Sequence, residues 1–411
     1  MTEVDDSITL HSKSFALPQI PTVIVCVDGF DPEYLEQGIT DGLLPNCKKF
    51  IESGFHCIAN AAMPSFTNPN NTSIITGVPT AVHGISGNFF LDRETGKETM
   101  VTDASLLRGS TILAEMSKRG VRVAAVTAKD KLRRILGFGL QNAICFSAEY
   151  ANQCTKAENG IDNVELWIGR PAPNQYSADL SLYVLDAGVK LLEERRADLF
   201  YLTLSDFIQH IHAPGDPVAN EFMHAIDKRF GKLVELGAIV AVTGDHGMSD
   251  KSTYDGSPHV LFLQEELESH FGVGSVRVIC PITDPFVKHH GALGSFVRVY
   301  VHGSNRDEIL EYCKIFPEVE VVLSGSEAAS RFEMPFDREG DIVVVAVKNA
   351  VIGSKRSEHD LEQLRGHRLR SHGGISEQPV PLIRSKPVKD PDLASKKSWR
   401  NFDIFDLALN W

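Results

Sequence analysis

Runs of mostly apolar residues recur along the first part of the chain, and most of them end at or just before a glycine, a lysine or an acidic residue. An apolar run without polar alternation is typical of a strand that is buried on both faces of a sheet. Such strands are predicted at 22–28, 121–127, 143–146, 198–206 and 238–243.

Segments with helical periodicity separate these runs. Helices are predicted at 33–38, 45–54, 110–120, 180–196 and 217–236, and a closing helix at 402–411. Strands that alternate with helices predict an α/β fold, with a mostly parallel sheet flanked by helices on both faces. The polar, charged stretch 386–397 is predicted to be a loop.

The pattern changes after residue 246, where the predicted strands become shorter. They lie at 259–263, 275–280, 295–301, 318–323 and 341–347, and a helix is predicted at 305–315. A chain of 411 residues exceeds the size at which one core usually stops growing. The sequence therefore predicts a large α/β core at 1–254 and 366–411, with a small α+β insert or cap at 255–365.

Three acids, Asp28, Asp206 and Asp245, each close one of the predicted parallel strands. The carboxyl ends of the strands in an open α/β sheet form the ligand-binding crevice. Three carboxylates meeting there would repel one another and shift their pKa values, unless cations lay between them.

Histidines accompany these acids. Asp206 and His210 have i,i+4 spacing, His246 follows Asp245 directly, and His372 precedes two glycines. Each of them alone would be read as a helix cap or a satisfied polar group, but together they predict a metal site. Mixed nitrogen and oxygen ligands suit zinc, with manganese or iron left open on geometry alone. Two divalent ions would leave this set with a net charge of about +1, which favours an anionic substrate.

Thr67 lies between a proline-containing loop and the predicted start of a helix. A hydroxyl at a helix N-terminus faces unpaired backbone N–H groups, where a phosphoryl group binds well. The structural alternative is that Thr67 only caps the helix. Lys129 and Lys131 follow the strand at 121–127, on the crevice side, and their structural alternative is a solvated loop.

Composition limits the partners. A net charge of −13 argues against nucleic acid or an acidic membrane surface as a partner, although metal ions and lysines can still attract a small anion. No apolar run approaches membrane-spanning length, and the acidic first residues do not resemble a signal peptide. The seven scattered cysteines favour reduced thiols, so a cytoplasmic protein without disulfides is expected.

Several motifs follow one another in the order of a known superfamily: Val27–Gly29, Phe66–Thr67, Thr76–Pro79, His83–Ile85, Asp206-x-x-x-His210, Thr243–Met248 and His372–Gly373. On these motifs the chain resembles the alkaline phosphatase superfamily, in its nucleotide pyrophosphatase/phosphodiesterase-like branch. The resemblance implies an alkaline phosphatase-like core and two zinc ions per chain. One ion would be held by Asp28, Thr67, Asp245 and His246, and the other by Asp206, His210 and His372. The residues after His210 lack the usual Gly-Pro order, so His212 is a second-ranked alternative ligand.

Within that branch the chain resembles the phosphonoacetate hydrolases, on Asn88 in Ser86–Phe90 and on Ala128–Lys131. This resemblance implies cleavage of the carbon–phosphorus bond of phosphonoacetate to acetate and phosphate, with Thr67 as nucleophile. Lys129 and Lys131 would bind the carboxylate and its developing enolate, and Asn88 would donate to a phosphonyl oxygen. In an alternative route, an activated water attacks and Thr67 only orients it.

Other functions share parts of this pattern. A phosphodiesterase or nucleotide pyrophosphatase would use the same metal ligands and would need an aromatic slot for a base. A sulfatase is disfavoured because the chain has no Cys-x-Pro-x-Arg motif, and a phosphoglycerate mutase would have a serine nucleophile and a larger insert. A non-catalytic binding protein would have lost ligands, and none is missing here. The oligomeric state stays open, with a homodimer as one option.

Overall fold

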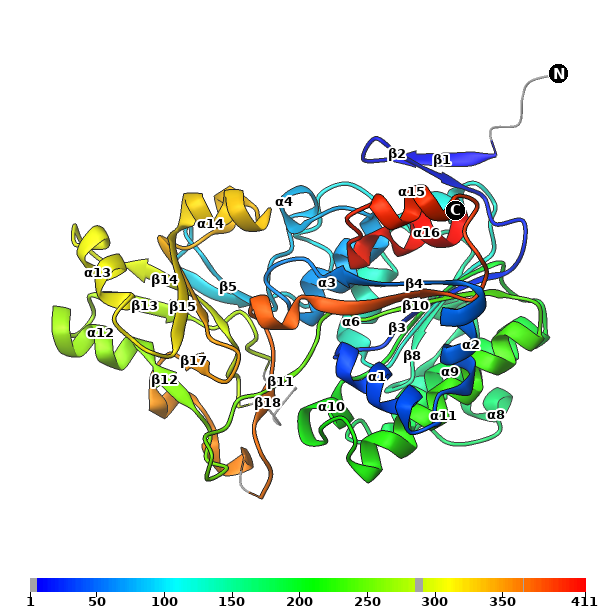
Figure 1. Cartoon of the computed structure of the whole chain (residues 1–411). Helices are drawn as coiled ribbons and strands as arrows, with labels where there is room; N and C mark the ends of the chain where they lie inside the picture. The colour runs from blue at the N-terminus through cyan, green and yellow to red at the C-terminus, as the bar shows by residue number, and fades with distance from the viewer. Residues whose placement is uncertain (1–5, 285–290, 365) are drawn as a thin grey trace.

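The computed structural model describes residues 6–284, 291–364 and 366–411. Its main feature is a seven-stranded sheet with the strand order β4-β19-β10-β3-β9-β7-β8 (Figure 1). The strands are β4 (Phe55–Asn60), β19 (Pro379–Arg384), β10 (Ile239–Thr243), β3 (Thr22–Cys26), β9 (Leu199–Thr203), β7 (Val123–Thr127) and β8 (Ile144–Ser147). The pairs from β10 to β8 are parallel, and only β19 pairs antiparallel with both of its neighbours. The predicted mostly parallel sheet is confirmed.

Every residue of β3, β7, β8 and β9 is buried, which explains the uninterrupted apolar runs. One face of the sheet packs against α1 (Pro32–Thr40), α2 (Pro45–Ser53), α9 (Ala178–Glu193) and α11 (Pro217–Glu235). The other face packs against α3 (Thr67–Thr76), α5 (Ile112–Lys118), α6 (Asp130–Leu136) and α16 (Ile404–Leu409). The helices on both faces confirm the predicted fold class.

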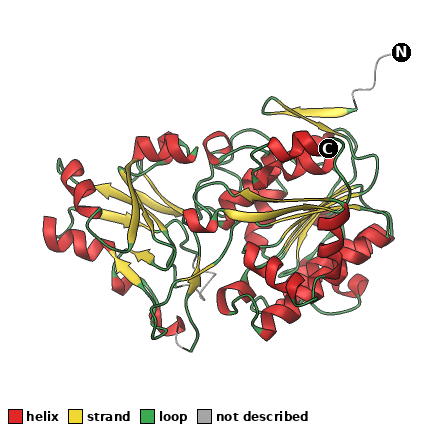
Figure 2. Ribbon diagram, in the orientation of Figure 1, coloured by secondary structure: helices red, strands yellow, loops and turns green. Residues whose placement is uncertain are grey.

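A second, smaller sheet has the antiparallel order β13-β14-β16-β15. It consists of β13 (Val276–Ile279), β14 (Phe296–Val301), β15 (Val319–Ser324) and β16 (Ile342–Ala346). It has its own apolar core with α12 (Leu263–Phe271), α13 (Arg306–Cys313) and α14 (Gly325–Phe332). Figures 1 and 2 show it beside the larger sheet. Two short strands that pair with each other, β11 (Ser249–Asp250) and β18 (Arg370–Ser371), carry the chain towards it and back.

Two local predictions need correction. The stretch 386–397 is not entirely a loop, because α15 forms at Pro391–Lys396. Asp390 caps this helix by accepting from the Leu393 N–H, and proline at the first position suits a helix start. The strand β19 escaped prediction because Pro379 and Pro381 argue against a strand inside a sheet.

No helix in the described ranges is both long enough and apolar enough for a bilayer crossing.

Candidate active site

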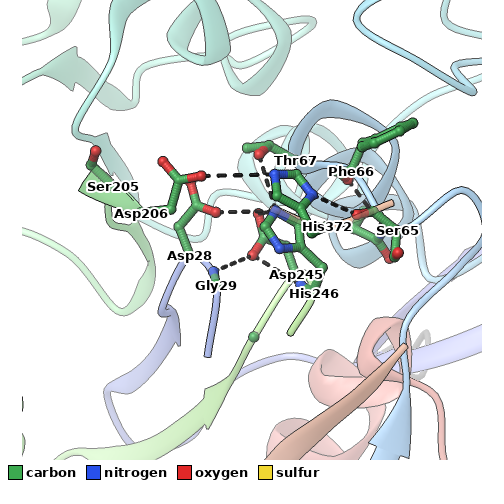
Figure 3. A network of polar contacts seen from close by, with 12 residues as sticks. Asp28, Gly29, Ser65, Phe66, Thr67, Ser205, Asp206, Asp245, His246 and His372 are labelled. Carbon is green, nitrogen blue, oxygen red and sulfur yellow. Dashed lines mark hydrogen bonds and ion pairs between the residues drawn. The ribbon is translucent and has the colours of Figure 1, made fainter. Parts of the chain in front are cut away.

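The three predicted acids come together at the carboxyl edge of the large sheet. Asp28 follows β3, Asp206 follows β9 and Asp245 follows β10, and all three carboxylates are buried. Asp245 Oδ1 accepts a hydrogen bond of 3.2 Å from the Gly29 N–H, and Gly29 has a φ of +68°, in the left-handed region that favours glycine. Figure 3 shows the acids around the rings of His246 and His372.

The three predicted histidines share one kind of hydrogen bond, between Nδ1 and a backbone carbonyl. His210 Nδ1 lies 2.7 Å from the Arg370 carbonyl, His246 Nδ1 lies 2.9 Å from the Gly247 carbonyl, and His372 Nδ1 lies 2.8 Å from the Ser65 carbonyl. A backbone carbonyl can only accept, so each Nδ1 donates its hydrogen to that carbonyl. The other ring nitrogen, Nε2, is therefore the one turned towards the acids and towards a metal ion bound there.

The acids and histidines form two overlapping groups of ligand atoms. Asp206, His246 and His372 make one group and Asp28, Asp245 and His246 the other, each within 4.8 Å. His210 joins through Nε2, 2.7 Å from Asp206 Oδ2. The second-ranked alternative, His212, lies apart from these groups, with Nδ1 3.1 Å from Asp216 Oδ1.

The electrostatics of these groups fit cations. Burial, and then repulsion by Asp206, raises the pKa of Asp245 to about 7. Burial and the same kind of repulsion raise the pKa of Asp28 well above its ordinary value, and Asp28 Oδ1 accepts no hydrogen bond from the described residues. Burial, followed by the neighbouring His246 and His210, lowers the pKa of His372 well below its ordinary value. Crowded carboxylates beside neutral imidazoles are the donors that zinc prefers, so the residues fit two divalent ions.

Thr67 is the first residue of α3, and its hydroxyl lies 3.3 Å from His246 Nε2. The helix N-terminus therefore meets the acid–histidine cluster at this hydroxyl. The loop that carries His372 packs closely on the same region, since a Cβ at Gly373 would lie 2.3 Å from the ring of Phe66. Thr67 is thus placed where an attacking oxygen would lie beside both groups of ligands.

A cavity of about 220 Å³ opens beside Thr67 and is lined by Asp28, Asp206, Asn88, Lys129 and Lys131 among others. Lys129 Nζ lies 3.5 Å from Asp206 Oδ1, and Lys131 Nζ pairs with Asp284. Burial lowers the pKa of Lys131 despite Asp284, whereas Asp206 and Asp28 outweigh burial and raise the pKa of Lys129. The structure therefore brings both predicted lysines into the same cavity as four of the predicted metal ligands, Asp28, Thr67, Asp206 and His372.

Asn88 is held at the cavity wall by the 281–282 segment. Its backbone N–H donates to the Pro281 carbonyl at 2.8 Å, and its Nδ2 donates to the Ile282 carbonyl at 3.4 Å. An amide nitrogen has two hydrogens, so Asn88 can also donate to an oxygen bound in the cavity.

Two neighbours of the site were not predicted. Asn71 donates from Nδ2 to Asp245 Oδ2 at 3.1 Å, while its Oδ1 accepts from the hydroxyls of Tyr201 and Thr203. Its i,i+4 spacing from Thr67 was a usable signal. Asp284, the partner of Lys131, had no such signal in the sequence.

Comparisons with known proteins agree with this geometry. A family model described as type I phosphodiesterase / nucleotide pyrophosphatase matches residues 22–374. Solved structures of phosphonoacetate hydrolase from Sinorhizobium meliloti, in complex with phosphonoformate and with phosphonoacetate, are 47% identical in sequence. They cover 98% of both chains, with TM-scores of 0.94 and 0.93.

The matches to curated sequences are shorter. Phosphonoacetate hydrolase of Penicillium oxalicum is 49% identical over 41 residues, which are 10% of this chain and 57% of that protein. An uncharacterised pyrophosphatase/phosphodiesterase of Schizosaccharomyces pombe is 35% identical over 80 residues. Those residues are 20% of this chain and only 16% of the yeast protein.

Proposed function

The chain belongs to the type I phosphodiesterase / nucleotide pyrophosphatase family of hydrolases, and on that premise we propose that it is a two-zinc phosphonoacetate hydrolase. The observation that carries the proposal is that Lys129 and Lys131 line the same cavity as Thr67 and the buried acids Asp28 and Asp206. The similarity to the Sinorhizobium meliloti enzyme over nearly the whole chain supports it.

Phosphonoacetate has a phosphonyl group at one end and a carboxylate at the other. The phosphonyl group would lie against Thr67 and the acid–histidine cluster, with Asn88 donating to one of its oxygens. The carboxylate would then face Lys129 and Lys131. Two zinc ions, when bound by the predicted ligands, would offset the negative charge there and lower the pKa of the Thr67 hydroxyl.

In the proposed reaction, Thr67 Oγ1 forms a bond to phosphorus while the phosphorus–carbon bond breaks. The bonding pair stays on carbon and delocalises into the carboxylate as an enolate, whose charge the two ammonium groups stabilise. Water then protonates the carbon to give acetate, and the hydroxide that remains takes up the proton that the Thr67 hydroxyl released. A second water hydrolyses the phosphothreonine, which releases phosphate and restores Thr67.

The segment predicted as a cap, residues 255–365, has a role in this proposal. Pro281 and Ile282 fix Asn88, and Asp284 holds Lys131. The cap would therefore position one group at each end of the substrate and would help to exclude water from the cavity.

A phosphodiesterase or nucleotide pyrophosphatase activity is the second candidate. Tyr150 and Tyr176 line the same cavity and are 43% and 38% exposed. These rings are the aromatic surface on which a nucleotide base could stack.

A substrate panel on the purified protein tests the proposal. Phosphate release from phosphonoacetate should far exceed hydrolysis of a phosphodiester, should stop on chelation and should return with zinc. Metal analysis of the active protein should find two ions per chain. Faster turnover of the phosphodiester would favour the second candidate, and full activity with at most one bound ion would contradict the two-zinc site.

A further inference from the structure

One ion pair is completely buried between the loops that carry the predicted metal ligands. Lys251 Nζ lies 2.9 Å from Glu377 Oε1, and both side chains are 0% exposed. Burying an ion pair without further hydrogen bonds costs more than the pair returns. Each partner here does have further bonds, and those bonds lead to the active site.

Glu377 joins two ligand-bearing loops. Its backbone carbonyl accepts from the Gly247 N–H at 2.7 Å, directly after His246. Its Oε2 accepts from the Gly374 N–H at 3.0 Å, two residues after His372. The rings of His246 and His372 stack with centroids 3.6 Å apart and planes 8° apart. A single residue thus links the turns behind two stacked ligands.

Lys251 extends this link to the smaller sheet. Its Nζ also donates to the Lys348 carbonyl at 2.7 Å, just beyond β16. Its backbone N–H donates to the Leu369 carbonyl at 2.8 Å, three residues before His372. The ammonium therefore balances the charge of the buried Glu377 carboxylate at Oε1, while the other oxygen, Oε2, accepts from the Gly374 N–H.

From these contacts we infer that Glu377 is a positioning residue, which fixes the separation of His246 and His372 and so the affinity of the two-metal centre. The inference rests on the proposed two-zinc function. Groups that orient ligands from behind typically contribute 10–100-fold to metal affinity. The contact that matters most is the one from the carboxylate to Gly374, with Lys251 supporting it.

Two double variants separate this role from stability. K251M/E377Q removes the charges but leaves an amide oxygen that can accept from Gly374. K251M/E377L has the same first substitution and a side chain of similar size that cannot accept. Replacing a buried ion pair with apolar groups is often tolerated, so both variants are expected to fold.

A third double variant, R298M/E339Q, is the matched control. Arg298 and Glu339 form another buried pair, each 1% exposed, whose guanidinium donates to the Ser86 carbonyl at 3.1 Å. Among the described residues, no hydrogen bond of this pair reaches a predicted metal ligand. The zinc affinity of R298M/E339Q should therefore match that of the unmodified protein.

The readouts are zinc affinity by competition with a chromophoric chelator, the visible spectrum of the cobalt-substituted protein, and the melting temperature of the metal-free protein. K251M/E377L should bind zinc roughly 10–100-fold more weakly and change the cobalt spectrum. K251M/E377Q should remain close to the unmodified protein in both measurements, whatever the two melting temperatures.

Equal zinc affinities in the two variants, whether both retained or both weakened, would overturn the role of the Gly374 contact. If K251M/E377L does not fold, K251M/E377Q alone tests the inference. A tenfold or greater loss of zinc affinity in K251M/E377Q would contradict it. An unmodified protein that binds no zinc would instead overturn the proposed function, and the inference would fall with it.

Discussion

Among single residues, Thr67 carries the sharpest expectation. Its hydroxyl lies 3.3 Å from His246 Nε2, at the first position of α3. T67A should lose most turnover of phosphonoacetate, whereas T67S keeps a hydroxyl and should retain a measurable part. The measurement is kcat at saturating zinc, with the metal content of each variant determined, because Thr67 is also a predicted ligand. Near-normal turnover by T67A would exclude Thr67 as the nucleophile.

The two lysines separate this activity from ester hydrolysis. If they stabilise the enolate, K129A or K131A should lose a contact made chiefly in the transition state, which costs about 2–4 kcal/mol or roughly 10²–10³ in rate. An aryl phosphate ester has no carboxylate on its leaving group, so its hydrolysis should fall much less. K118A is the control, since Lys118 pairs with Glu115 on the surface of α5. An equal loss against both substrates would make the lysines general anion binders.

Some residues of the site could be predicted from the sequence and others could not. Asp28, Asp206 and Asp245 are visible because each follows an apolar run that must be a buried strand. Asp284 and Glu377 are not visible, because their partners Lys131 and Lys251 lie 153 and 126 positions away. A lone acid in an irregular segment has no periodicity that would reveal such a partner.

At the level of elements, α3 depends on an anchor near its end. His83 is buried, and its Nδ1 accepts from the Ile85 N–H at 3.2 Å, so Nε2 donates to Ser73 Oγ at 2.8 Å. H83Q should destabilise the protein by about 1–3 kcal/mol near neutral pH, because it leaves buried polar groups without partners. Urea unfolding of both proteins under the same conditions measures this difference.

The difference in the free energy of unfolding between H83Q and the unmodified protein should depend on pH. Burial lowers the pKa of His83 to about 3, far below the ordinary value of 6.5. Between about pH 3 and pH 6.5, His83 is protonated in the unfolded chain but neutral in the folded protein. The stability from neutral His83 is therefore complete above pH 6.5 and is lost as pH falls towards 3, by up to about 1.4 kcal/mol per unit. The disadvantage of H83Q should shrink on acidification, and a constant difference would contradict this account.

How well each strand and helix could be predicted depends on how its residues are buried. The fully buried strands were found because burial on both faces requires apolar residues throughout. Two of their ends were placed too late. β3 stops at Cys26 rather than at residue 28, and β9 stops at Thr203, so that Asp206 lies beyond it at the start of the short helix α10 (Phe207–Ile211). The helix α15 was missed because only Ala394 is buried in it, so its sequence has no apolar stripe.

At the scale of the whole molecule, the predicted ligands come from both ends of the chain. Asp28 precedes the segment that forms the smaller sheet, and His372 follows it. The shorter strands after residue 255 indicated a separate insert. The pattern could not show that this insert touches Asn88 and Lys131, because packing between distant segments leaves no periodic trace. Metal binding across such segments should stabilise the whole fold.

The stabilisation of the fold by bound zinc should increase with pH, because the acids in the ligand set bind protons at low pH. Without metal, the pKa of Asp245 is about 7, so this carboxyl carries a proton at lower pH that zinc must displace. Burial lowers the pKa values of His246 and His372, which are therefore already neutral and release no proton. Each displaced proton weakens zinc binding up to tenfold per pH unit below about 7. Binding to the folded state raises stability by RT ln(1 + [zinc]/Kd), so weaker binding means a smaller gain.

The rise in melting temperature from chelator to zinc should consequently be larger at about pH 8 than at about pH 6. Calorimetric titration in buffers of different ionisation enthalpy should show more protons released per zinc ion at the lower pH than at the higher. The control is R298M/E339Q, whose buried pair lies outside the ligand set and which should show the same pH dependence as the unmodified protein. An equal rise at both pH values would mean that Asp245 is ionised before zinc arrives. In that case Lys129, whose Nζ lies 3.5 Å from Asp206 Oδ1, would already offset the charge of the acids.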